Sequence, residues 1–484
     1  MSTAVPALPL TSIQEAMWTA YRIAPDSAAY NIVMPLRLSG RVDPVAMDAA
    51  VTAVGERQEL LRSVFAEAGG RPVRIASDAP VVRLELRDLD GIDEDGLLRA
   101  AEEAGARPFR LESGTFRVVL LRRADDDWAL VTSAHHIVSD FTSRWLLVRD
   151  VLDAYAAHAA GTAPGWRPLK GSYTEHAAAE LAHTASEAGL RAAVAWRESV
   201  AGSTPAELPL DRPRPRVRSL RGDTVVRRLA PEAADGIGAA AGAAGVTPFA
   251  YLLAVFQSLT HRWTGQDDFL LGVPASSRSG RGQRDVIGCF LNTIPVRAEF
   301  GPGATFRDAA AQAGERIMRG MLGVRYPCGL AFPQATLFRA ALFLVHMDRM
   351  EPPVPNVLPG QAVGRVIPYA GLDIALIDVP QQEGQLDLLL RIEQTPEGVT
   401  AVFSYDTDVL DRTTVERFAD GYERMLTAAV RDPDARITDV ELAADADLDA
   451  VLALGSGETG AFDDFNSFNS FNSFDSFEKA WDHR

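Results

Sequence analysis

The sequence predicts an α/β fold made of two lobes of similar size. The chain of 484 residues is too long for one ordinary hydrophobic core, its 47% hydrophobic content is that of a globular protein, and strand-like and helix-like segments alternate along most of its length. We expect an N-terminal lobe over residues 1–180, a C-terminal lobe over residues 181–450 and a low-complexity tail over residues 451–484.

In the predicted N-terminal lobe, helices are expected where apolar residues recur every three or four positions, and strands where β-branched and apolar residues gather. The predicted helices cover residues 12–19, 44–58 and 143–158, and the predicted strands cover residues 30–38 and 128–133. The second strand runs directly into His135 and His136, so two imidazoles are expected where a strand gives way to a loop.

The predicted C-terminal lobe repeats this alternation after helical patterns over residues 173–201. A segment rich in Pro and Arg, residues 205–221, is expected to cross the surface between the lobes. Strands and helices then alternate over residues 224–229, 248–261, 269–273, 292–297, 306–322, 342–346, 386–392, 399–405 and 413–429.

Composition excludes several classes of function. The formal charge of −17 and pI near 5.0 argue against nucleic acid as a partner, because that binding depends on clustered Lys and Arg. The two cysteines, Cys289 and Cys328, form no CxxC or Cys/His cluster, so neither a disulfide framework nor a metal site is expected. Without an apolar run of about 18 residues or a signal-peptide pattern, we expect a cytoplasmic protein that does not enter a membrane.

The histidine pair carries the clearest chemical signal. In the segment VTSAHHIVSD, a carboxylate at Asp140 follows the second histidine by four residues. An imidazole that titrates near neutrality can accept a proton from an attacking amine or hydroxyl, or hold that nucleophile by a hydrogen bond. Two adjacent histidines are more often structural, so this pattern needs support from the rest of the chain.

That support is a resemblance that extends over nearly the whole chain. The segment at residues 135–140 resembles the HHxxxDG motif of the condensation domains of nonribosomal peptide synthetases, relatives of chloramphenicol acetyltransferase. Further segments resemble the motifs of this family in order: residues 12–18 (SIQEAMW), 57–65 (RQELLRSVF), 173–176 (YTEH), 287–293 (IGCFLNT) and 405–411 (YDTDVLD). In the second of these, Gln58 stands where the family usually has His.

The resemblance implies two chloramphenicol acetyltransferase-like lobes in a V-shaped pseudo-dimer with a central tunnel. Donor and acceptor groups on phosphopantetheine arms of carrier proteins would enter from opposite faces and meet at His136. The expected function is a free-standing condensation enzyme that transfers a carrier-bound acyl or peptidyl thioester to a free or carrier-bound amine or hydroxyl. No cofactor is expected on the chain itself, and the setting implied is antibiotic or other secondary metabolism.

The resemblance also assigns roles to individual residues. His136 is expected to be catalytic and His135 to pack and hydrogen-bond beneath it. Asp140 is expected to be structural and to pair with an arginine of the second lobe, for which Arg278 is the best candidate. The side chains expected to line the tunnel or substrate channel are Phe141, Ser143, Asn292, Ser12 and Gln14.

One departure from the motif leaves alternatives open. Phe141 replaces the glycine that usually follows the aspartate, so the ring must point into the core or narrow the tunnel. This change is compatible with an active enzyme, with a reshaped channel, or with a non-catalytic domain that recruits carrier proteins or tailoring enzymes. An acyltransferase that uses coenzyme A donors is a further alternative.

The tail has a different character. Phenylalanine recurs every third residue at Phe465, Phe468, Phe471, Phe474 and Phe477, with Asn, Ser and Asp between. This spacing fits neither a helical stripe nor a strand. It indicates either a disordered segment or a short motif that docks onto a partner synthetase.

Overall fold

The N-terminal part of the chain is built on a six-stranded sheet. The structure is a computed structural model, and it describes residues 7–77, 82–333, 335–346, 366–369, 371–377, 384–395 and 398–442. Every neighbouring pair of strands in this sheet is antiparallel except β5 and β6, which are parallel. The order across the sheet is β13 (Ile367–Tyr369), β14 (Leu372–Leu376), β2 (Asn31–Ser39), β7 (Asp127–His135), β6 (Phe116–Ala124) and β5 (Leu84–Asp88).

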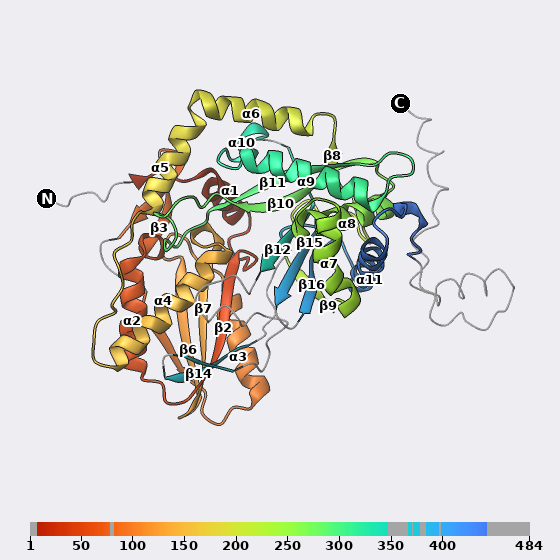
Figure 1. Cartoon of the computed structure of the whole chain (residues 1–484). Coiled ribbons are helices and arrows are strands. Elements are labelled where there is room, and N and C mark those ends of the chain that lie inside the picture. The colour runs from red at the N-terminus through yellow and green to blue at the C-terminus, as the bar shows by residue number, and fades with distance from the viewer. Residues whose placement is uncertain are drawn as a thin grey trace, which may run out of the picture. The chain divides into compact units, whose positions relative to one another are not determined.

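Helices cover both faces of this sheet, as the strand alternation requires (Figure 1). On β2, Val33 faces the helix α3 (Glu94–Ala106), while Met34 and Leu36 pack in the cluster that also contains residues of α2 (Pro44–Arg57) and α4 (Phe141–Ala159). Successive side chains of a strand point to opposite faces, so a strand that is buried on both faces is apolar almost throughout. β7 is such a strand. Its last residue is His135, and His136 follows directly after it.

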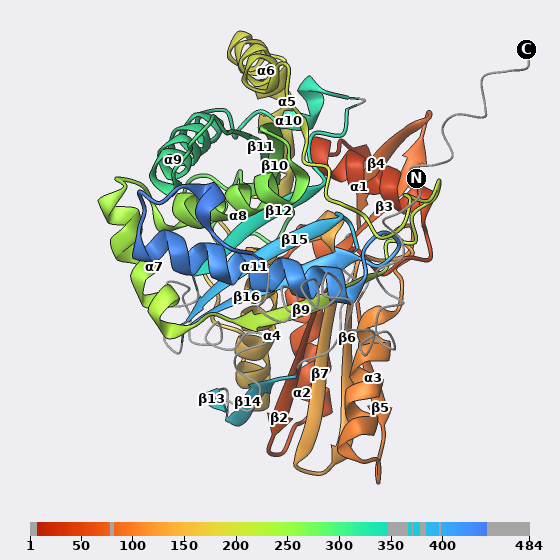
Figure 2. The same cartoon turned by 90° about the vertical axis from the view of Figure 1, so that its right-hand side faces the viewer.

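The second sheet belongs to the C-terminal half of the chain. Its order is β11 (Leu291–Glu299), β10 (Asp268–Ser276), β12 (Ala340–His346), β15 (Leu388–Thr395), β16 (Gly398–Asp406) and β9 (Gly222–Arg228), with β8 (Thr204–Pro205) paired to β10. The helices α7 (Pro231–Ala243), α8 (Pro248–Thr264), α9 (Phe306–Leu322) and α11 (Arg412–Arg431) pack with it and with one another. Figure 2 shows α11 lying in front of the strands β15, β16 and β9, with α7 beside one end of it.

The remaining elements surround these two sheets. A small sheet has the strand order β1 (Ala7–Leu8), β4 (Arg71–Ala76) and β3 (Ser63–Ala68), and β3 directly follows the 3₁₀ turn at Glu59–Arg62. The helices outside the sheets are α1 (Ser12–Ile23), α5 (Tyr173–Thr184), α6 (Glu187–Val200) and the short α10 (Cys328–Ala331), and a 3₁₀ turn lies at Ile437–Asp439.

The strands β13 and β14 do not follow the predicted division of the chain at residue 180. They come from the C-terminal half, yet β14 pairs with β2 of the first sheet, where Ile374 lies opposite Leu38. Ile374 and Leu372 are buried in the same apolar cluster as Leu38, which explains why the hairpin is held there. The predicted lobe over residues 181–450 therefore contributes two strands to the sheet of the other lobe.

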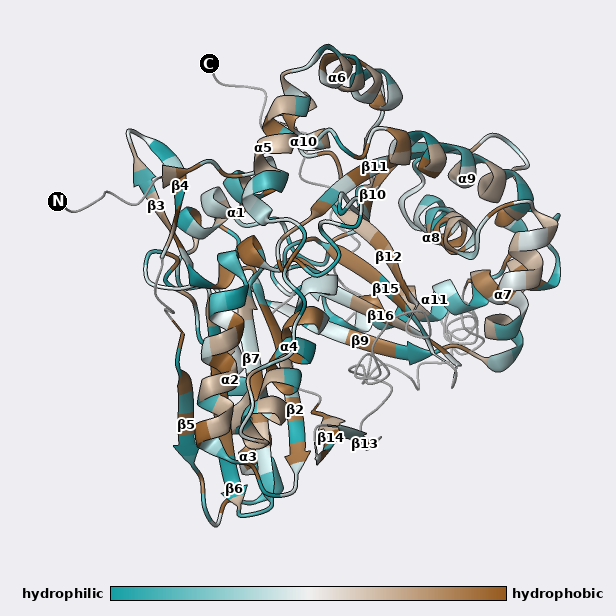
Figure 3. Ribbon diagram, turned by 60° about the vertical axis from the view of Figure 1, so that its left-hand side comes forward, coloured by the Kyte–Doolittle hydropathy of each residue, from teal (hydrophilic) through white to brown (hydrophobic). Residues whose placement is uncertain are grey.

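Most predicted elements are present, with ends displaced by a few residues. The predicted helix over residues 306–322 matches α9. The strand predicted over residues 128–133 corresponds to β7, which is longer at both ends. The hydrophobic patterning that made these predictions possible is visible on the strands β10, β12 and β15 in Figure 3. The predicted tail over 451–484 lies outside the described residues.

None of the described helices is by itself long and apolar enough to cross a membrane, although α7 and α8 together pass that test as a pair bent by 104°. The same described residues contain no group of three or more His, Cys, Asp or Glu side chains placed to hold a metal ion.

Candidate active site

His135 is the last residue of β7 and is built into the protein beneath the loop. Its Nδ1 accepts a hydrogen bond of 3.1 Å from the backbone N–H of Ile137, and only 4% of the residue is exposed. The rings of Tyr21, Tyr30 and Phe109 surround it at 6.0–6.5 Å between centroids. Burial lowers the pKa of His135 to about 3, with a smaller contribution from His136, so the ring is neutral and structural.

His136 follows at the first position of a short 3₁₀ turn, His136–Val138. Its backbone N–H donates to the carbonyl of Tyr30 at 2.7 Å, which fixes the loop to the start of β2. Its Nδ1 lies 3.8 Å from Sγ of Cys289, whereas its Nε2 has no hydrogen-bond partner in the part of the chain that the structure describes. Nδ1 is thus the ring nitrogen that is turned toward Cys289.

The electrostatic surroundings favour a neutral His136. Burial lowers the pKa of His136 below the usual value for histidine. Hydrogen bonding to its own backbone, the negative charge of Asp140 and hydrogen bonding to the backbone of Ser139 oppose this change without reversing it. A neutral imidazole retains a lone pair, so it can accept a proton at pH 7.

Asp140 ties the loop to the helix that follows and to the second half of the chain. Its Oδ1 caps α4 by accepting from the backbone N–H of Ser143 at 2.7 Å, and its Oδ2 accepts from the N–H of Phe290 at 3.1 Å. The guanidinium of Arg278 lies 3.3 Å from both carboxylate oxygens. Asp140 is 7% exposed, and its pairing with Arg278 is the contact predicted from the motif.

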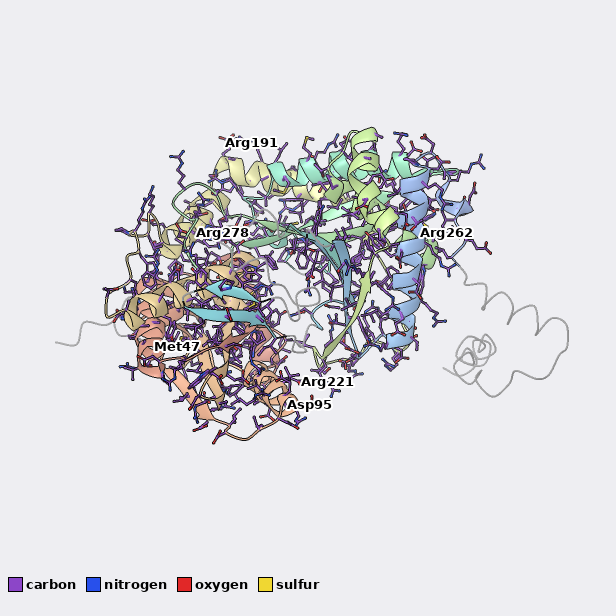
Figure 4. All side chains as sticks on the ribbon, turned by 60° about the horizontal axis from the view of Figure 1, so that its bottom comes forward. Met47, Asp95, Arg191, Arg221, Arg262 and Arg278 are labelled. Atoms are coloured by element: carbon purple, nitrogen blue, oxygen red, sulfur yellow. The ribbon has the colours of Figure 1, made fainter. Side chains whose placement is uncertain are left out.

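Arg278 stands just after β10 and is labelled in Figure 4. Besides Asp140, its guanidinium donates to the carbonyls of Gln283 and Val286, both at 2.6 Å. The same group lies over the ring of Phe290, with 4.0 Å from its central carbon to the ring centroid. Arg278 therefore closes its own loop as well as pairing with Asp140.

Three side chains that were expected to line the channel, those of Ser143, Gln14 and Asn292, form hydrogen bonds to backbone groups of the loop or its neighbours. Ser143 is fully buried and exchanges hydrogen bonds with the backbone of Gly288, accepting from its N–H at 3.0 Å and donating to its carbonyl at 2.8 Å. Gln14, also fully buried, donates to the carbonyl of Ile137 at 2.9 Å. Ser12 uses its backbone N–H to reach Glu180 at 2.7 Å.

Asn292 behaves in the same way. Its amide nitrogen donates to the carbonyls of Val324 and Tyr326, at 2.7 and 3.0 Å, and its oxygen accepts from the N–H of Cys328. A short polar side chain that is buried is normally held by hydrogen bonds to backbone groups, and sequence position alone cannot distinguish such a brace from a channel wall. The hydrogen-bonding groups of Gln14, Ser143 and Asn292 are thus engaged with the backbone, and the channel-lining role of Ser12 stays a prediction.

Two residues at the site were not predicted to act there. Gln58 accepts from the N–H of Ile287 at 3.0 Å and donates to the carbonyl of Asp285 at 3.0 Å, so it links α2 to the segment before β11. Tyr173 donates to the carbonyl of Cys289 at 2.7 Å and shares a hydrogen bond with Thr11. Their presence inside family-like motifs was the only signal that could have identified them.

Phe141 lies at the first position of α4, where its ring packs edge-on against Trp145 and Phe343, at 6.5 and 6.3 Å between centroids. Arg144 covers it from another side at 4.3 Å. Phe141 and Phe343 line a cavity of about 500 Å³. His136 is not among the residues that line this cavity, although Asp140 and Phe290 are.

Comparison with known proteins identifies the family. The condensation-domain model matches residues 6–452. The chain is 28% identical over 448 residues to a linear gramicidin synthase protein of Brevibacillus parabrevis, a match that covers 90% of this chain but 6% of that relative. It is 30% identical over 441 residues to the phosphinothricin tripeptide synthetase PhsC of Streptomyces viridochromogenes, which covers 88% of this chain and 39% of that relative. The chain thus spans less than half the length of these relatives.

Two solved structures show the same fold. The complex of the X-domain and OxyB from teicoplanin biosynthesis matches with a TM-score of 0.81 at 23% identity, over 92% of this chain and 98% of that one. The first condensation domain of the calcium-dependent antibiotic synthetase, in complex with a substrate analogue, matches with a TM-score of 0.73 at 23% identity, over 90% and 99%. The two sheets and their helices have the chloramphenicol acetyltransferase-like fold, and the chain belongs to the condensation-domain family of nonribosomal peptide synthetases.

Proposed function

We propose that this chain is a condensation enzyme that transfers an acyl or peptidyl group from a carrier-protein thioester to an amine or hydroxyl acceptor. The observation that supports this most directly is His136: its Nδ1 is turned toward Cys289 while its Nε2 has no hydrogen-bond partner within the described residues. A group placed in this way can take a proton from a nucleophile and give it up again.

The proposed reaction needs one proton carrier and no cofactor on the chain. The acceptor nitrogen or oxygen attacks the thioester carbonyl carbon, and a tetrahedral intermediate forms. Its collapse breaks the carbon–sulfur bond and releases the phosphopantetheine thiol. Nε2 of His136 accepts the proton that the nucleophile loses and returns it to the leaving sulfur, so atoms and charge balance.

The supporting residues would keep His136 in place during this reaction. His135, held by Ile137, fixes the start of the turn, and Asp140, held by Arg278 and Phe290, fixes its end. Holding both reactants close to such a group removes entropy from the barrier, which can contribute several orders of magnitude in rate. Phosphopantetheine arms of separate carrier proteins would deliver the acyl donor and, where the acceptor is also carrier-bound, the acceptor.

Recruitment without catalysis is a second candidate function. It is favoured by the likeness to an X-domain whose structure was solved in complex with OxyB, and by Phe141 at the position of the motif glycine. In that case the chain would bind a carrier protein or a partner enzyme while His136 would have no role in bond formation.

Turnover with a loaded carrier separates these functions. The wild type, His136→Ala and the control His183→Ala would be incubated with an acyl-loaded carrier protein and a panel of amines and alcohols, and products followed by mass spectrometry. Since general bases contribute about 10²–10⁴-fold, we expect a loss of at least about 100-fold for His136→Ala and none for His183→Ala, whose ring lies in the last turn of α5.

Other results would contradict the proposal. Carrier binding without any product, unchanged in His136→Ala, would identify a recruitment domain. Efficient turnover of acyl-coenzyme A with no preference for a loaded carrier would identify a coenzyme A-dependent acyltransferase.

A further inference from the structure

The cavity beside the histidine loop is lined almost entirely by apolar side chains. Four phenylalanines from four different segments contribute to its wall: Phe141 at the start of α4, Phe249 in α8, Phe290 before β11 and Phe343 in β12. Val273, Ile317 and Leu344 are among the aliphatic side chains that also line it. Its volume of about 500 Å³ falls within the range of small-molecule sites, which is roughly 300–1,000 Å³.

The cavity and His136 are bordered by the same two chain segments. In the first, Asp140 and Phe141 follow His136 by four and five residues and line the cavity. In the second, Cys289 contacts Nδ1 of His136, and its neighbours Phe290 and Leu291 line the cavity. In both segments, the residues that line the cavity are therefore separated by only a few positions in sequence from His136 or from its neighbour Cys289.

Among the described residues of this wall, no free charge faces a ligand. Asp140 is the only ionisable residue among them, and both of its carboxylate oxygens are already occupied by Ser143, Phe290 and Arg278. A ligand carboxylate or ammonium placed here would lose its hydration without gaining a counter-ion, which is strongly unfavourable. The wall thus selects against charged groups and in favour of hydrocarbon.

We propose that this cavity is the binding site for the side chain or tail of the transferred acyl group, and that it takes an uncharged, apolar acyl group. The proposal rests on the function proposed above and names its donor class. Phe141 and Phe343, whose rings meet edge-on, form the part of the wall that limits acyl length. The phenylalanine that departs from the family motif is then a specificity-determining residue.

Binding of two matched thioesters tests the proposal without any need for turnover. Octanoyl-pantetheine and suberyl-pantetheine have the same chain length and differ by one terminal carboxylate. Titration calorimetry with His136→Ala, in the absence of any acceptor, should show octanoyl-pantetheine binding at least ten-fold more tightly than suberyl-pantetheine. Shortening the acyl chain should weaken binding by about four-fold for each methylene removed from the cavity.

Variants then locate the site. Ala275→Phe, from β10, would fill the cavity and should remove the ten-fold preference, whereas Ala239→Phe on the exposed surface of α7 is the matched control and should leave it unchanged. Phe343→Ala enlarges the cavity and should move the preference toward acyl chains longer than octanoyl. This second variant keeps the test decisive if Ala275→Phe does not fold.

The outcomes separate this proposal from the one on which it rests. Equal affinity for the two thioesters, or a preference that persists in folded Ala275→Phe, would overturn the assignment of the cavity. Tight, cavity-dependent binding of octanoyl-pantetheine by a wild-type protein that forms no product would leave the site standing and would reject the proposed condensation activity.

Discussion

The carboxylate of Asp140 and the guanidinium of Arg278 lie 3.3 Å apart, and they join the histidine loop to the loop that follows β10. Both side chains are about nine-tenths buried. The ion pair is therefore a structural link between segments 138 residues apart in the chain, rather than an exposed surface contact.

Asp140→Ala should act mainly by lowering the free energy of unfolding. The protein that still folds should turn over at a rate closer to that of the wild type. The change leaves Arg278 without its counter-ion, removes the cap of α4 and leaves the N–H of Phe290 unpaired, so a cost of about 3–5 kcal/mol is expected. Urea denaturation and the yield of soluble protein measure it. Asp235→Ala, at an exposed position of α7, should change stability by less than about 0.5 kcal/mol. A soluble, fully stable Asp140→Ala that is only slow would contradict the structural role.

Gln58→Ala should be costly because a buried amide bridge is broken. The substitution leaves the N–H of Ile287 and the carbonyl of Asp285 without this partner, and a loss of about 1–3 kcal/mol is expected. Gln312 is the matched control, since its amide also bridges to the backbone, at Glu299, but in an exposed place. Chemical denaturation should show a much smaller loss for Gln312→Ala. Similar losses for the two variants would reject the importance of burial at Gln58.

His135 should make the protein less stable in acid. Its pKa is about 3 when folded and about 6.5 when unfolded, so the unfolded chain binds the extra proton between these values. The stability that neutral His135 supplies is complete above pH 6.5 and declines as the pH falls toward 3. Between pH 7 and pH 5 the loss from this residue should be about 2 kcal/mol. Denaturation at both pH values should show that His135→Asn loses about 2 kcal/mol less than the wild type over this interval.

The pH dependence of turnover should report His136. Because burial lowers its pKa, His136 remains neutral down to a pH below the usual 6.5 of histidine. The rate kcat/KM should therefore stay level as the pH falls through 7 and decline only at a lower pH, in the range where His136 gains its proton. Any residual activity of His136→Ala should lack this decline. An acidic limb that persists unchanged in His136→Ala would assign the titration to another group.

Both cysteines should be unreactive in the native protein. Burial raises the pKa of the Cys328 thiol to about 12 and raises the pKa of Cys289 further, so neither forms appreciable thiolate at neutral pH. A thiol reagent such as dithiobis(nitrobenzoic acid) should titrate both cysteines of the chain in denaturant and neither without it. Fast reaction of Cys289 in the native state would show that the histidine loop opens, because Cys289 contacts His136.

The sequence by itself determined most of the elements and the position of the histidine pair. An apolar strand such as β7 and an amphipathic helix such as α9 follow from local periodicity, which depends on which faces must be buried. The motif resemblance also identified Asp140 and Arg278 as partners. The elements and the histidine pair could be predicted because each depends on a short stretch of residues, whereas the pairing of Asp140 with Arg278 was predicted from the resemblance alone.

Only the tertiary structure decided which polar side chains face the site. Gln14, Ser143 and Asn292 lie in the right motifs, but their hydrogen-bonding groups are occupied by backbone atoms of segments far away in sequence. The pairing of β14 with β2 and the phenylalanine wall around Phe141 likewise depend on contacts between distant segments. The physical reason is that burial and hydrogen-bond satisfaction are properties of the folded neighbourhood, which no local pattern contains.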